Sequence, residues 1–407
     1  MKILFLSALY PPQTRGGGEL STHYIAQGLR QIGHEVQVVT TGARNGAYEV
    51  EGVPVRVLAA NLTAKPLLER RHSRKMAKIL AREINSGKKY DVVHAHDFRS
   101  ALALAELNLP NALVTTRDYA QICGSPNNLL ADGRECPGCT SIKNVLQNRN
   151  VVEAPFLRKP FRVWQYRYNI GYRLKAFRKF KQQVFISHAQ LAEIKKIQDL
   201  SQTQTTVIYN PVPPAYLNNA IQLPVGRTIL FVGTIESYKG VGLLLEAFKQ
   251  ISRQYNDINL KIVGEGAGKE GYQNWVEKNG LQYRVTFVGR VPWDHMGRIY
   301  DEAAIVVAPH IWVEPFGRTV AEAMARGKIV ISANIGGPAE IIQPFKTGVL
   351  FERGSVEDLI LSIGEVLEMN EFDKREISRA AREWVANNLN IEKIAREYEE
   401  VYKNYLC

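Results

Sequence analysis

Cysteine is scarce in this sequence, with four residues in 407, too few for a disulfide scaffold and consistent with a reducing compartment. Long hydrophobic runs are missing too, since none reaches the roughly 18 residues that a membrane-spanning helix requires. The apolar start, residues 1–6, is followed by Tyr10-Pro11-Pro12 without a cleavage site of small residues, so we interpret it as a buried strand and not as a signal peptide. We therefore expect a cytoplasmic protein.

Acidic residues are absent from residues 154–192, and the whole chain has a net charge of +12, which predicts anionic partners. Within residues 156–181 the cations alternate with Trp, Tyr and Phe, as in helices that lie on an anionic membrane surface. The alternatives are a helical hairpin with packed aromatics and solvated cations, and a nucleic-acid patch, which we regard as unlikely. In the membrane interpretation, replacing cations such as Arg173 and Arg178 with Gln abolishes binding to anionic liposomes.

Strands and helices alternate along both halves of the chain. Residues 3–6, 35–39 and 91–95 are short apolar runs typical of buried strands, and residues with helical spacing lie between them. The same pattern restarts at residues 228–233, after a proline-rich stretch that we interpret as a linker. Alternation of this kind predicts an α/β fold with doubly wound parallel sheets, and 407 residues suit two such domains.

Residues 314–325 are the most informative stretch. The apolar run at residues 303–308 precedes them and predicts a buried strand, so they form a loop followed by the start of a helix. Free amides at such a helix start suit a diphosphate or sugar oxygens. Glu322 has a position from which it can accept two hydrogen bonds from a ribose diol, and Glu314 can reach another polyol. The alternative is that both carboxylates are ordinary partners of the helix dipole.

Three motifs carry a resemblance to a known family. Residues 314–317 read Glu-Pro-Phe-Gly, residues 322–325 read Glu-Ala-Met-Ala, and residues 336–340 read Gly-Gly-Pro-Ala-Glu. Together they resemble the donor-site signature of the retaining GT-B fold glycosyltransferases of family four, which includes mannosyl-, glucosyl- and sucrose-forming enzymes. The resemblance implies two Rossmann-like domains that face each other across a cleft. It also implies metal-independent hexosyl transfer from a nucleotide-diphosphate sugar to an acceptor hydroxyl, without a further cofactor.

The resemblance implies roles for individual residues. Glu314 is expected to contact the donor sugar, Glu322 to hold the ribose, and Lys239 to grip the diphosphate. Glu314, Lys239 and Arg117 are the expected catalytic residues. The other residues that the resemblance places at the donor are Gly17, Gly18, Gly264, Arg290, Phe316, Gly317, Arg318 and Thr319.

The sequence departs from the family pattern at two positions. Arg117 stands where relatives usually carry a His, and a guanidinium donates hydrogen bonds but does not exchange protons. We expect it to stabilise phosphate charge, with an ion pair to Asp118 as the alternative. Thr234 stands where relatives carry an Arg, which removes one charge-assisted contact to the diphosphate. Our hypothesis is that Arg318 or Arg117 compensates.

Two groups of residues could suggest a metal. His94 and His96 lie two apart on an extended segment, but no further ligand is nearby in the sequence, and the resemblance implies a cleft wall. Cys123, Cys136 and Cys139 have the spacing of a zinc knuckle but lack a fourth ligand, so we favour a reduced cluster that stabilises the loop over a structural zinc.

We predict an acceptor-side domain at residues 1–208, a linker at 209–226, a nucleotide-sugar domain at 227–385, and a C-terminal helix within 386–407. In GT-B enzymes such a helix packs back on the first domain. A saccharide or lipid-linked acceptor, in surface polysaccharide or glycolipid assembly, is the expected partner. Two alternatives stay open: an epimerase or phosphorylase on the same scaffold, and a catalytically degenerate binding module at the membrane.

Overall fold

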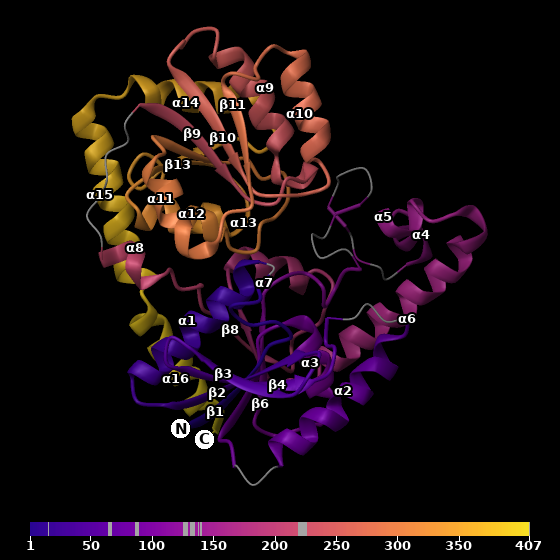
Figure 1. The fold of residues 1–407 in the computed structure, drawn as a ribbon. Helices are drawn as coiled ribbons and strands as arrows, with labels where there is room; N and C mark the ends of the chain where they lie inside the picture. The colour runs from indigo at the N-terminus through magenta and orange to yellow at the C-terminus, as the bar shows by residue number, and fades with distance from the viewer. Residues whose placement is uncertain are drawn as a thin grey trace. The chain divides into compact units, whose positions relative to one another are not determined.

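The computed structural model describes residues 1–14, 16–63, 67–85, 89–124, 129–130, 135–136, 138, 141–218 and 226–406. The chain forms two compact units. Unit 1 consists of Met1–Pro211 with Ile391–Cys407, and unit 2 consists of Val212–Asn390. Figure 1 shows that each unit has its own sheet with helices packed around it.

Unit 1 is built on an eight-stranded sheet with the order β3-β4-β2-β1-β5-β6-β7-β8. All neighbouring strands are parallel except β3 and β4, which form an antiparallel pair at one edge. The strands are β1 (Lys2–Leu6), β2 (Glu35–Gly42), β3 (Gly46–Val50), β4 (Val53–Ala59), β5 (Val92–Ala95), β6 (Ala112–Thr116), β7 (Gln182–Phe185) and β8 (Gln204–Val207). The chain order reverses between β1 and β5, and parallel sheets bind ligands at such a switch point.

Helices cover both faces of this sheet because alternate side chains of its strands point to opposite sides. Ile3 and Phe5 pack with α1 and α16, whereas Leu4 and Leu6 pack with α2, α3 and α6. The helices are α1 (Gly17–Gln31), α2 (Glu69–Ile84), α3 (Phe98–Ala105), α4 (Ile142–Leu146), α5 (Arg149–Val152), α6 (Lys159–Phe177), α7 (His188–Lys195) and α16 (Ile391–Leu406), with a short 3-10 turn η1 (Phe156–Arg158). Helix α16 thus completes a unit whose other elements lie far from it in the sequence.

Unit 2 is built on a six-stranded, all-parallel sheet with the order β11-β10-β9-β12-β13-β14. The strands are β9 (Arg227–Val232), β10 (Ile258–Val263), β11 (Val285–Gly289), β12 (Ile305–Ala308), β13 (Ile329–Ala333) and β14 (Val349–Phe351). The helices are α8 (Pro214–Asn218), α9 (Val241–Ile251), α10 (Lys269–Lys278), α11 (Met296–Asp301), α12 (Arg318–Ala325), α13 (Gly336–Ile341), α14 (Val356–Glu368) and α15 (Glu371–Asn388), with 3-10 turns η2 (Ser237–Lys239) and η3 (Trp293–His295).

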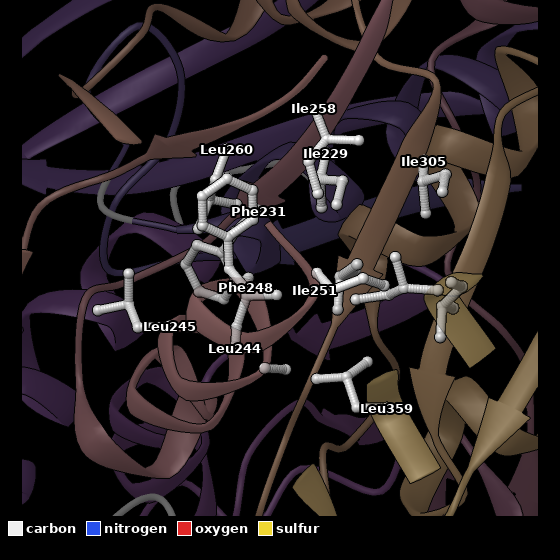
Figure 2. Close-up of a cluster of buried hydrophobic side chains, with 14 of the residues drawn as sticks. Ile229, Phe231, Leu244, Leu245, Phe248, Ile251, Ile258, Leu260, Ile305 and Leu359 are labelled. Atoms are coloured by element: carbon white, nitrogen blue, oxygen red, sulfur yellow. The ribbon is translucent and has the colours of Figure 1, made fainter. Parts of the chain in front are cut away.

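The main core of unit 2 lies between its sheet and two helices. Ile229 and Phe231 of β9 pack with Phe248 of α9 and Leu359 of α14, and all four side chains are at most 1% exposed. Figure 2 shows these strand residues pointing toward the helix residues. The apolar strand runs that predicted parallel strands are therefore buried under helices, and the predicted doubly wound α/β fold is confirmed in both units.

Within residues 156–181 the chain forms a 3-10 turn at 156–158 and one long helix at 159–177, and not a helical hairpin. The first half of α6 presents aromatic side chains to solvent: Phe161 is 46% and Trp164 50% exposed. The second half is partly internal, and Arg173 is buried in a bidentate ion pair with Glu69. The expectation that Arg173 contacts an anionic membrane surface is therefore wrong, because its charge is already matched by Glu69 inside the unit.

Candidate active site

The loop that joins β12 to α12 carries the central motif in unit 2. Its last residue, Gly317, has a φ of +82° and caps the N-terminus of α12. A Cβ there would lie 2.5 Å from Cγ of Pro338, so only glycine fits both the backbone angle and the space. Gly337 donates its N–H to the Glu314 carbonyl at 2.8 Å. The second motif segment, residues 336–338, thus fixes the shape of the first.

Glu314 lies at the centre of a small charged cluster. Its carboxylate accepts a hydrogen bond and ion pair from the Nζ of Lys239, and Nε2 of His310 lies 3.3 Å from the same oxygen. Burial by itself raises the pKa of the Glu314 carboxyl, but the combined effect of Lys239, His310 and Trp312 outweighs burial, so the pKa lies below its usual value. Glu314 is therefore an anion at neutral pH.

His310 is neutral in this cluster. Burial lowers its pKa to about 4, although Glu314 partly opposes the shift. At neutral pH the ring beside Glu314 therefore does not add a second positive charge. The cluster holds one cation and one anion, with Lys239 and Glu314 side chains 17% and 14% exposed.

Lys239 is positioned by the turn η2 and by an aromatic neighbour. The next residue, Gly240, has a φ of +78°, and a Cβ there would lie 1.7 Å from the carbonyl oxygen of Pro309. The turn can therefore press against the loop after β12 only with glycine at this position. The ammonium of Lys239 also lies 5.0 Å from the ring centroid of Trp312, a favourable cation–π distance.

Glu322 is 7% exposed and its two oxygens have partners within unit 2. Oε2 accepts a hydrogen bond from the hydroxyl of Tyr300 at 2.9 Å, and Oε1 accepts one from Nε of Arg318 at 2.6 Å. A ribose diol would therefore have to share or replace these contacts. The sequence did not predict Tyr300 as a partner of Glu322, because no local pattern links two residues that are 22 positions apart.

The other expected donor residues lie at strand ends or at the start of α12. Gly264 follows β10 with a φ of +141°, and a Cβ there would lie 1.8 Å from the carbonyl oxygen of Gly233. Arg290 follows β11 and is exposed. Phe316 is 3% exposed, and Thr319 lies in the first turn of α12. These positions share the carboxyl edge of the sheet, where ligands of parallel sheets bind.

Three expected site residues belong to unit 1. Gly17 and Gly18 open α1 after β1. The guanidinium of Arg117 donates to the carbonyl oxygen and Nδ1 of His96, and to Oδ1 of Asn210 at 2.6 Å. A contact of these three residues with a donor stays a prediction.

His94 has a structural role that the sequence did not predict. It is fully buried, with Nδ1 2.7 Å from the hydroxyl of Tyr402 in α16 and Nε2 2.8 Å from the hydroxyl of Thr115. Tyr398 of α16 also reaches Thr115, at 3.1 Å. His94 therefore ties the sheet to α16, and only the 308-residue separation from Tyr402 hid the contact.

Within the described part of the chain, no group of three or more His, Cys, Asp or Glu side chains is arranged to hold a metal ion. Cys123 and Cys136 are buried and do not form a disulfide with described residues, while Cys139 lies outside the described residues. Among the helices of the described residues, none combines the length and apolarity needed to cross a bilayer.

Comparison with known families now identifies the chain. The model for glycosyltransferase family 4 matches residues 15–216, and the model for glycosyl transferases group 1 matches residues 224–384. The chain belongs to the family four glycosyltransferases of the GT-B fold. It is therefore a nucleotide-sugar-dependent glycosyltransferase, which confirms the resemblance carried by the motifs.

Two relatives match over nearly their whole length. An uncharacterised glycosyltransferase of Methanocaldococcus jannaschii is 26% identical, over 99% of this chain and 98% of the relative. Glycogen synthase of Mycobacterium tuberculosis is 25% identical, over 99% of this chain and 94% of the relative.

Two solved structures share the fold. Sucrose-phosphate synthase from Thermosynechococcus elongatus has a TM-score of 0.74 at 20% identity, covering 99% of this chain and 98% of that one. Anabaena HepE in complex with UDP and glucose has a TM-score of 0.68 at 20% identity, covering 99% of each chain. At this identity the likeness shows the GT-B fold alone.

Proposed function

We propose that this protein transfers a hexosyl group, with retention of configuration, from a nucleotide-diphosphate sugar to an acceptor hydroxyl. The observation that carries the proposal is the Lys239–Glu314–His310 cluster beside the N-terminus of α12. It combines a cation and the amides of a helix start, which suit a diphosphate, with a carboxylate that can face a sugar.

Chemically, the main requirement is to stabilise the leaving diphosphate, which gains negative charge as the glycosidic bond breaks. Preorganised cations and amides supply that stabilisation without an acid or a metal. We assign Lys239 and the amides of Phe316, Gly317 and Arg318 to the diphosphate. Glu314 then contacts the sugar and steadies the developing positive charge of its ring.

Glu322 is proposed to hold the ribose. Its present partner Arg318 lies at the same helix start, so a ribose that takes the Glu322 oxygen releases the guanidinium toward the diphosphate. This exchange would supply the cation that Thr234 does not provide. A nucleotide complex in which Arg318 keeps its hydrogen bond to Glu322 and stays away from the phosphates would rule the exchange out.

A donor screen tests the proposal most directly. UDP-, GDP- and ADP-sugars should raise the melting temperature selectively, because a bound ligand stabilises the folded state by mass action. UDP-glucose is the first candidate, since HepE has been solved with it. With the selected donor, Glu314→Ala should lower kcat and Glu322→Ala should raise the donor KM. A Glu314→Ala enzyme with unchanged turnover would contradict the assignment.

The same assay separates the alternative functions. Transfer releases nucleoside diphosphate only when an acceptor is added, whereas an epimerase converts the donor without any acceptor. A degenerate binding module would be stabilised by a donor but would neither hydrolyse nor transfer its sugar with any acceptor offered.

We further propose that the outward face of η1 and the first half of α6 binds an anionic membrane, so that the protein acts at the inner face of the membrane on a lipid-linked or surface-polysaccharide acceptor. This face consists of Phe156, Leu157, Phe161, Trp164 and Tyr168. Phe156 is 83% and Leu157 90% exposed. The rings of Phe161, Trp164 and Tyr168 follow one another at centroid distances of 5.8 and 5.6 Å. The exposed cations Arg158 and Arg167 lie on the same segment, and aromatic and basic residues together suit a charged bilayer surface.

Vesicle cosedimentation tests this face. Trp164→Ser should reduce binding to vesicles that contain phosphatidylglycerol, whereas Tyr283→Ser, at a ring that is 90% exposed in unit 2, should leave binding unchanged. Equal loss in both variants, or no loss in either, would remove the membrane proposal.

A further inference from the structure

Unit 1 contains a cavity of about 790 Å³ at the carboxyl edge of its sheet. The segments after β1, β5 and β6 form its floor, and α6 forms one wall. The cavity therefore lies at the β1–β5 switch point, where doubly wound sheets bind ligands. Gly18 and Arg117 are among its lining residues.

Two of the acidic groups in the cavity are already neutralised or fully hydrogen-bonded. Glu69 forms the bidentate ion pair with Arg173, whose Nη1 also donates to the carbonyl oxygens of Ala120 and Cys123. Asp97 caps α3, and its oxygens accept four hydrogen bonds from the amides of Ala8, Arg99 and Ser100 and from the Ser100 hydroxyl. These groups hold the walls together and leave little capacity for a ligand.

Arg99 is different because its guanidinium has no hydrogen-bond or ion-pair partner among the residues that the structure describes. It lies on the first turn of α3 and is partly buried, and burial lowers the pKa of its guanidinium. The Phe98 ring lies 5.9 Å from the guanidinium carbon, and the carboxylates of Glu69, Asp97 and Asp118 act on its charge from a longer distance. A partly buried guanidinium that forms no hydrogen bond or ion pair with these carboxylates keeps its donors for a ligand, so this position favours an anionic group.

Arg162 brings a second guanidinium to the cavity from α6. Its one hydrogen bond within the described chain runs from Nη1 to Oε1 of Gln165, at 3.1 Å, which leaves its other donors for a ligand. Planar guanidinium groups bind phosphate oxygens in pairs, which gives both strength and orientation.

Asp118 adds a group that suits a hydroxyl. Its Oδ1 accepts the amide of Ala120 at 2.8 Å, and burial raises the pKa of its carboxyl. A carboxylate beside two guanidiniums repels a bare phosphate but accepts a hydrogen bond from a sugar or polyol hydroxyl. Glu19 of α1 also lines the cavity. The mixed lining therefore fits a molecule with hydroxyls and a phosphate and does not fit a phosphate alone.

We infer that this cavity binds the acceptor and that the acceptor is a phosphorylated polyol or sugar, with its phosphate on Arg99 and Arg162 and a hydroxyl on Asp118. The inference rests on the proposed transferase function and specifies its acceptor class. The phosphate can come from a soluble sugar phosphate or from a lipid headgroup, and α6 borders both the cavity and the proposed membrane face.

Calorimetric titration with glucose 6-phosphate tests the inference, with glucose as the uncharged control. The titration is made with saturating nucleoside diphosphate, so that the phosphate site of the donor is filled. Glucose 6-phosphate should bind more tightly than glucose. Arg99→Gln should weaken its binding about tenfold to a hundredfold, because a charge-assisted hydrogen bond is lost. Arg99→Lys should recover part of the affinity.

Arg167→Gln is the control, because it removes an exposed cation of α6, the helix that carries Arg162, at a position outside the cavity, and should leave the titration unchanged. The inference fails if glucose and glucose 6-phosphate bind equally, or if the wild-type and Arg99→Gln chains bind glucose 6-phosphate equally. The exception is a result in which the vesicle measurement below shows that Arg99 binds a lipid headgroup. Stabilisation by the nucleoside diphosphate reports on the proposed function separately. It should be the same in the Arg99→Gln chain, which also shows that this variant folds.

Vesicles distinguish the two sources of phosphate. If the ligand is a headgroup, the wild-type chain binds phosphatidylcholine vesicles that contain phosphatidic acid, and Arg99→Gln lowers this binding although Trp164 is intact. If the ligand is a soluble sugar phosphate, Trp164→Ser leaves glucose 6-phosphate binding unchanged. If Arg99 contributes to neither measurement, the cavity has no phosphate site.

Discussion

The ion pair between Lys239 and Glu314 leads to a prediction about both stability and donor binding. We consider Lys239→Met, Glu314→Gln and the double variant. At hydrogen-bond distance and an effective dielectric constant of about 20, two unit charges attract by about 5 kcal/mol. Desolvation offsets much of this, because both side chains are less than one-fifth exposed. We therefore expect each single variant to lower the free energy of unfolding by about 2 kcal/mol. The double variant should lose about 1–2 kcal/mol less than the sum of the two single losses.

Denaturant unfolding measures the stabilities, and titration with the nucleoside diphosphate measures binding. Lys239→Met should weaken nucleotide binding at least tenfold, since it removes a charge-assisted contact. Glu314→Gln should keep or strengthen it, because the ammonium no longer has a competing anion, while kcat falls by about a hundredfold. Additive stability losses would show that the pair is not coupled. Equal weakening of nucleotide binding by both variants would refute the division of roles between diphosphate and sugar.

Gly317→Ala should lower the free energy of unfolding by about 2 kcal/mol or more, because alanine is strained at this φ and its Cβ clashes with Pro338. Gly354 has the same φ of +82° but open space around it, so Gly354→Ala should lower that free energy by only about 1 kcal/mol. The pKa of His310 is about 4 in the folded chain and about 6.5 in the unfolded chain, so the unfolded chain binds the proton first as the pH falls. The free energy of unfolding should therefore fall by up to about 3 kcal/mol between about pH 6.5 and pH 4. His310→Gln should flatten that fall in acid-unfolding curves, and His295→Gln, at an exposed ring, should not. Tyr402→Phe leaves a buried imidazole nitrogen without its partner and should cost about 1–3 kcal/mol in denaturant unfolding.

The sequence predicted the parts of this molecule that depend on local pattern. Short apolar runs such as residues 3–6 and 91–95 became central parallel strands, because strands buried on both faces need continuous apolar residues. The segment around Glu314 was placed correctly between a strand and a helix. Strand β3 was missed because it is an edge strand that pairs antiparallel with β4 and has no fully buried residue to mark it.

Contacts between distant residues were out of reach. Arg173 was interpreted from its basic neighbours, and nothing near it indicated that Glu69, 104 residues away, would neutralise it. The candidate site shows the same limit: the motif named Glu314 and Lys239 as site residues, but their direct contact across 75 residues was not foreseen. Spacing along a chain shows which residues share an element, whereas side-chain pairing between elements depends on how those elements pack.

The return of α16 to unit 1 has a consequence for biosynthesis. Unit 2 is continuous in the chain, so it can reach its native contacts as soon as its last helix leaves the ribosome. Unit 1 is synthesised first but remains incomplete, because α1 and His94 pack against α16, which is translated only after the whole of unit 2. The surface of β1 and α1 that α16 covers is therefore exposed for most of the chain's synthesis, and unit 1 reaches its final packing after unit 2.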